Sequence, residues 1–62
     1  MDIKTGTEFL HTKWLAEDYQ SPMRCVITKI KHDVVYWQPV NGGSPMMFDL
    51  DEADKWIKEI VE

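Results

Sequence analysis

The chain has few of the cross-links that stabilise small domains. It contains a single cysteine, so Cys25 cannot form an internal disulfide, and no Cys/His cluster shows the spacing of zinc ligands. A domain of 62 residues without these supports depends on packing or on association with another chain. Its seven aromatic residues favour packing. We therefore predict one domain, residues 1–62, with one small core and no cofactor; homo-oligomer formation is compatible with this.

Long apolar runs are also missing. The first residues, MDIKTG, have no apolar stretch behind their charges, and no later run approaches the length of a membrane span. The sequence therefore predicts neither a signal peptide nor a membrane-spanning segment. Together with the unpaired Cys25, this favours a cytoplasmic location, where thiols stay reduced.

An excess of positive charge is absent as well. The net charge is −4, and all of the excess negative charge lies in residues 49–62, because acids and bases balance in residues 1–48. Proteins that bind nucleic acid generally need a basic surface that releases counterions. The whole-chain charge therefore argues against general nucleic-acid binding, although a local basic stripe remains compatible with it.

What the sequence does contain is a series of short strand patterns. The predicted strands cover residues 6–15, 23–31, 34–40 and 45–48. His32 and Asp33 are expected to form a two-residue turn, and Asn41-Gly42 is a strong hairpin signal because both residues tolerate positive φ. The last three strands therefore form an antiparallel meander.

The last segment predicts a helix over residues 50–61. Asp49 can cap the amide of Glu52, and apolar residues then recur at helical spacing. The acids crowd the first turn, where the helix dipole favours them. We therefore predict a mainly β (α+β) fold of about four to five antiparallel strands, spanning residues 6–48, with one C-terminal helix packed on the sheet.

Three short patterns followed by a capped helix resemble small SH3-like barrel proteins, including short proteins of phages and mobile elements. The patterns are Gly-Thr-x-Phe, Pro-x-x-Cys-Val-x-Thr-x-Ile and Val-Val-Tyr-Trp. The resemblance covers most of the chain and implies a small, strongly bent antiparallel β-barrel in a context of regulators and accessory factors. It implies no catalytic residue. SH3-like barrels commonly bind peptides, modified side chains or nucleic acid through aromatics near their loops, which here are Trp14, Tyr19, Tyr36 and Trp37.

No set of residues assembles a catalytic or metal site. Cys25 lies within a predicted strand among β-branched residues, so we expect a buried thiol. The doublet His32-Asp33 has no further ligands and is interpreted as a turn. His11 is expected at the surface of its strand. We predict that the protein is not an enzyme.

The pair Tyr36-Trp37 carries the functional question. Neighbouring side chains on a strand point to opposite faces, so one ring should enter the core while the other is covered by the helix or exposed. The sequence leaves open which ring is which. Trp14 and Tyr19 flank a polar loop and serve either packing or recognition.

Two functions follow from these residues. We predict a non-catalytic binding or regulatory protein that contacts a partner protein through exposed aromatics. The alternative is nucleic-acid binding on the β-surface, with bases stacked on Tyr36 or Trp37 and with Lys29 and Lys31 meeting phosphates. A surface of solvated lysines that protects against edge aggregation is the simpler explanation of Lys29 and Lys31.

Overall fold

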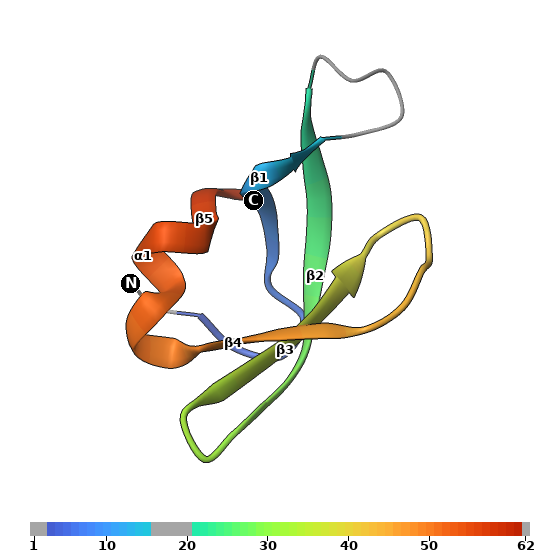
Figure 1. Ribbon diagram of the computed structural model, residues 1–62. Coiled ribbons are helices and arrows are strands. Elements are labelled where there is room, and N and C mark those ends of the chain that lie inside the picture. The colour runs from blue at the N-terminus through green and yellow to red at the C-terminus, as the bar shows by residue number, and fades with distance from the viewer. Residues whose placement is uncertain (1–2, 16–20, 62) are drawn as a thin grey trace.

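The computed structural model describes residues 3–15 and 21–61 (Figure 1). This part of the chain forms one antiparallel sheet of five strands, a short 3-10 helix and a single turn of α-helix. The elements are β1 (Glu8–Leu15), β2 (Pro22–Lys31), β3 (Val34–Pro39), β4 (Met46–Asp49), η1 (Leu50–Glu52), α1 (Ala53–Trp56) and β5 (Ile57–Val61). The predicted mainly β fold with antiparallel strands is confirmed. Tyr19 lies outside the described residues.

The strand order across the sheet is β4-β3-β2-β1-β5. The first four strands therefore follow one another as a meander, and the chain then returns so that β5 pairs with β1 on the far side from β2. Figure 1 shows α1 beside this returning strand, next to β1. The fold thus places the first and the last strand of the described chain side by side.

The turn between β2 and β3 has the predicted two residues. His32 and Asp33 have φ values of 53° and 63°, and Lys31 pairs directly with Val34 across the turn. Positive φ at both central residues is typical of type I′ hairpins, whose twist matches that of the strands. The predicted turn is therefore confirmed, and His32 is one of its two central residues.

A bulge at Thr28 bends β2. Ile27 pairs with Trp37, whereas Lys29 pairs with Tyr36, so one residue is inserted between the two pairs. Such an extra residue bends the strand and increases its twist. Because of it, residues 27 and 30 both contribute to the core although their spacing is odd.

The core lies on the inner face of the curved sheet. Its buried hydrophobic residues are Phe9, Cys25, Ile27, Val35, Trp37, Phe48, Ala53 and Ile57. The Phe9 ring meets the rings of Trp37 and Phe48 edge to face, with centroids 5.8 Å and 6.2 Å away. This is the preferred geometry of aromatic pairs. Three aromatic residues of the described chain, Phe9, Trp37 and Phe48, are therefore used for packing in the core.

The predicted helix over residues 50–61 is wrong in its extent. The helical part ends at Trp56, and the backbone of Ile57 is already extended, at φ −96° and ψ 113°. The rest of the segment, Ile57–Val61, pairs with β1, which satisfies its backbone groups and suits its β-branched residues. Asp49 does occupy the N-cap position of η1, but its side chain does not form the expected capping hydrogen bond.

Candidate functional site

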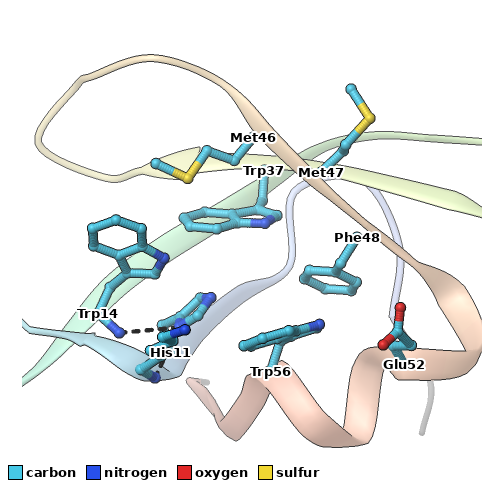
Figure 2. Close-up of a pocket in the computed structure, with 9 residues that line it drawn as sticks. His11, Trp14, Trp37, Met46, Met47, Phe48, Glu52 and Trp56 are labelled. Atoms are coloured by element: carbon cyan, nitrogen blue, oxygen red, sulfur yellow. Dashed lines mark hydrogen bonds between the residues drawn. The ribbon is translucent and has the colours of Figure 1, made fainter.

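A groove of about 310 Å³ opens between β1, β4 and α1, and we call it the aromatic groove. Figure 2 shows its rings arranged around a common hollow. It is lined by His11, Lys13, Trp14, Trp37, Met46, Met47, Phe48, Glu52 and Trp56. Its volume lies at the lower end of the range of ligand-binding pockets, and its lining is mostly apolar.

His11 lies at the floor of the aromatic groove. It is only 3% exposed, so the expected surface position is wrong. Its ring centroid is 4.8 Å from that of Trp37 and 5.8 Å from that of Trp56. His11 shares the face of the buried Phe9, two residues before it on β1, and this alternation explains its burial.

Two backbone amides fix the orientation of the His11 ring. The N–H groups of Lys13 and Trp14 both donate to His11 Nδ1, at 3.0 Å and 3.2 Å. Since Nδ1 is an acceptor, the proton of the neutral imidazole is on Nε2. The same two bonds fold the end of β1 so that Trp14 borders the groove, as Figure 2 shows.

Burial of His11 makes the stability of the protein depend on pH. Desolvation, and then the charge of Lys13, lower the pKa of His11 from its ordinary value of 6.5. Between that lowered pKa and pH 6.5 the unfolded chain binds the proton and the folded chain does not. We therefore expect the melting temperature to be highest above pH 6.5 and to fall as the pH drops below it.

The control for this prediction is His32→Asn, which removes the other histidine and keeps a residue suited to positive φ. Thermal melts followed by circular dichroism between pH 5 and pH 8 should show the same fall in both proteins. A fall that disappears in His32→Asn would assign the effect to His32 instead.

The structure separates the Tyr36-Trp37 pair. Trp37 is 2% exposed and contributes to the core and to the wall of the aromatic groove. Tyr36 is half-buried on the opposite, outer face of β3, where Lys29 Nζ lies 5.9 Å from the centre of its ring. The two rings therefore serve different faces.

The candidate residues accordingly fall into two groups. Trp14 and Trp37 both line the aromatic groove. Tyr36 and Lys29 lie on the outer face, and Lys31 is exposed beside the turn that joins β2 to β3. The structure does not bring the two groups into one site.

Charged side chains surround Trp56 at the rim of the groove. Lys55 Nζ lies 5.0 Å and Lys13 Nζ 5.9 Å from the centre of its ring. Lys55 Nζ also lies 3.9 Å from a carboxylate oxygen of Glu52. The Thr12 hydroxyl donates to the Lys55 carbonyl over 2.8 Å, which ties α1 to β1 and holds Trp56 above His11.

Cys25 is buried, as predicted, and its Sγ lies 3.6 Å from the Met23 carbonyl oxygen. Burial raises the pKa of the Cys25 thiol to about 11. At pH 8 only about one thiol in a thousand is then ionised, and the thiolate is the reactive form. We expect the folded protein to react with an aromatic disulfide reagent at least ~100-fold more slowly than the protein unfolded in guanidinium chloride. Equal absorbance-monitored rates would place Cys25 at the surface.

A second hollow lies at the other end of the sheet. It is lined by His32, Asp33, Asp49, Leu50 and Asp51. Within residues 3–15 and 21–61, no group of three or more His, Cys, Asp or Glu side chains is arranged to hold a metal ion. The backbone of this region is held by the Leu50 N–H, which donates to the Asp33 carbonyl over 2.8 Å.

Sequence reasoning missed several residues of the aromatic groove. His11 and Trp56 form its floor and lower side, and Lys13 and Met46 also line it. The sequence did contain a signal for His11, because His11 follows Phe9 by two residues on β1 and therefore shares its buried face. The sequence contained no such signal for Trp56, because the place of Trp56 in the groove depends on where the helix ends.

Comparison of the chain with protein-family models, with curated proteins and with solved structures found no match. None of the helices in the described part of the chain is long and apolar enough to cross a membrane. The site must therefore be interpreted from its own geometry.

Proposed function

We propose that this protein is a non-catalytic binding module that docks an extended segment of a partner protein in the aromatic groove. The observation that carries the proposal is the clustering of rings from separate elements around one open hollow, with Trp14 47% exposed at its edge. Tryptophan is among the residues that most often dominate the binding energy of protein interfaces.

We further propose that the fold is a small SH3-like barrel, as the sequence resemblance implies. Two features support this proposal: the meander of four strands with β5 returning to β1, and the short helical segment, η1 followed by α1, that precedes the last strand. A regulatory or accessory role in a reducing compartment is consistent with the unpaired, buried Cys25.

The proposal is tested by selecting peptides from a random display library against the immobilised protein. A selected peptide is then added to the isotopically labelled protein, and the amide and indole resonances are recorded by NMR. We expect the largest shifts at His11, Trp14 and Trp56. Shifts confined to Tyr36 and Lys29 would place the site on the outer face and reject the groove.

Nucleic-acid binding on the β-surface is the alternative from the sequence. It retains Tyr36 and Lys29, but Trp37 is not available on that face and Lys29 already lies over the Tyr36 ring. The discriminating measurement is a titration with single-stranded oligothymidine at increasing salt. Binding that weakens with salt and shifts the Tyr36 resonances would support the alternative.

A further inference from the structure

The aromatic groove contains a donor without an acceptor. Indole Nε1 of Trp37 is out of contact with solvent and has no hydrogen-bond partner among the described residues. Buried tryptophan N–H groups usually have a partner, because an unmade bond costs free energy. Figure 2 shows this nitrogen on the edge of the ring that faces the hollow. An acceptor supplied from outside would satisfy it.

His11 provides a second donor beside the first. Its ring centroid lies 4.8 Å from that of Trp37, and its proton is on Nε2 because Nδ1 already accepts two backbone N–H groups. No hydrogen bond joins this Nε2–H to an acceptor in the described part of the chain. The floor of the groove therefore offers donors and favours a ligand that carries an oxygen acceptor.

The charges at the rim act against a cationic ligand. Aromatic sites often bind cations through the faces of their rings. Here Lys13 and Lys55 of the chain itself already lie within 6 Å of the Trp56 ring, at 5.9 Å and 5.0 Å. Glu52 offsets Lys55 at 3.9 Å, and no carboxylate of the described residues lies within ion-pair distance of Lys13. Lys13 would repel an added cation and attract an anion.

We propose that the segment bound in the aromatic groove combines an apolar side chain with a carbonyl acceptor and an acidic neighbour. The apolar side chain lies between the rings of Trp14 and Trp56. The carbonyl oxygen accepts from Trp37 Nε1–H, which requires the side chains that shield this nitrogen from solvent to move aside. The acidic side chain lies beside Lys13. This inference rests on the proposed peptide-docking function.

The test uses three pools of acetylated and amidated pentapeptides. Within each pool the central residue is Leu, Ile, Met, Phe or Pro. The four flanking residues are all Glu in the first pool, all Gln in the second and all Lys in the third. The indole N–H resonances are followed by NMR and assigned with single Trp→Phe variants. We expect the Glu pool to move the Trp37 Nε1–H resonance downfield and to bind at least ~10-fold more tightly than the Lys pool, consistent with complementary charge at the rim.

The outcomes separate this inference from the function on which it rests. Binding of the Lys pool at least as tight as that of the Glu pool, or groove shifts without movement of Trp37 Nε1–H, would overturn the acceptor inference and leave the groove as the site. The absence of shifts at Trp14 and Trp56 with every pool would overturn both proposals.

The matched variant is Trp37→Phe, which keeps an aromatic ring in the core and removes the donor together with part of the ring. We expect it to lose about 3- to 10-fold in affinity for the Glu pool, the range of one hydrogen bond. Unchanged affinity in a folded Trp37→Phe protein would assign Trp37 a packing role alone. Circular dichroism melts of both proteins establish that the comparison is between folded chains.

Discussion

Trp37→Ala is expected to remove a large part of the free energy of unfolding at 25 °C. Trp37 is 2% exposed and packs against Phe9 and His11, so truncation leaves a cavity in the centre of the core. Removal of a buried tryptophan side chain costs about 3–5 kcal/mol. A domain of this size has roughly 3–9 kcal/mol of total stability. The free energy of unfolding from urea titration measures the loss.

Two variants control this prediction. Trp37→Phe should stay within about 1.5 kcal/mol of the wild type, because the lost ring contacts are offset by removal of the unsatisfied N–H. Tyr36→Ala, at the neighbouring but half-buried position, should cost clearly less than Trp37→Ala. A Trp37→Ala protein as stable as Tyr36→Ala would contradict the inward position of Trp37.

Trp14→Ala should produce the opposite result, with binding lost and the fold retained. Trp14 is 47% exposed at the edge of the aromatic groove, and its ring approaches that of His11 edge-on, with centroids 6.4 Å apart. Truncation of a binding tryptophan commonly costs about 2 kcal/mol or more, which is roughly a 30-fold loss in affinity. Stability should change by about 0.5 kcal/mol or less, as at other surface positions.

The matched control is Val40→Ala, which truncates another exposed apolar side chain outside the groove. Isothermal titration calorimetry with a display-selected peptide should give a dissociation constant close to the wild-type value for Val40→Ala. If Val40→Ala and Trp14→Ala weaken binding equally, the peptide binds elsewhere.

The hairpin architecture followed from local sequence signals. The positive φ of His32 and Asp33 and the alternation around them set the turn and the register of β2 against β3. Alternation also predicted that Tyr36 and Trp37 would face opposite ways, but not which one enters the core. That choice depends on the bulge at Thr28 and on pairing with β4, which are properties of the assembled sheet.

The end of the chain shows why local patterns mislead. Apolar residues at three- and four-residue spacing, including Ile57 and Ile60, satisfy a helix pattern. They also satisfy a bulged strand, because the register of β1 against β5 shifts between Leu10 and His11. The segment becomes a strand because the edge of β1 is free to pair with it. Whether such an edge is free depends on the assembled sheet, which local sequence patterns do not reveal.

The candidate site was predictable only in part for the same reason. Trp14 was identified as an aromatic beside a loop, and it does line the groove. The interpretation of His11 as a surface residue was wrong because His11 shares the buried face of Phe9, and the amides of Lys13 and Trp14 then hold its ring in place. Trp56 joins the groove because the helix stops after one turn.

Occupation of the aromatic groove by a peptide is tested most directly by intermolecular nuclear Overhauser effects between an unlabelled, display-selected peptide and the labelled protein. We predict contacts from the apolar side chain of the peptide to the rings of Trp14 and Trp56. Contacts found only with Tyr36 and Lys29, on the outer face, would contradict it.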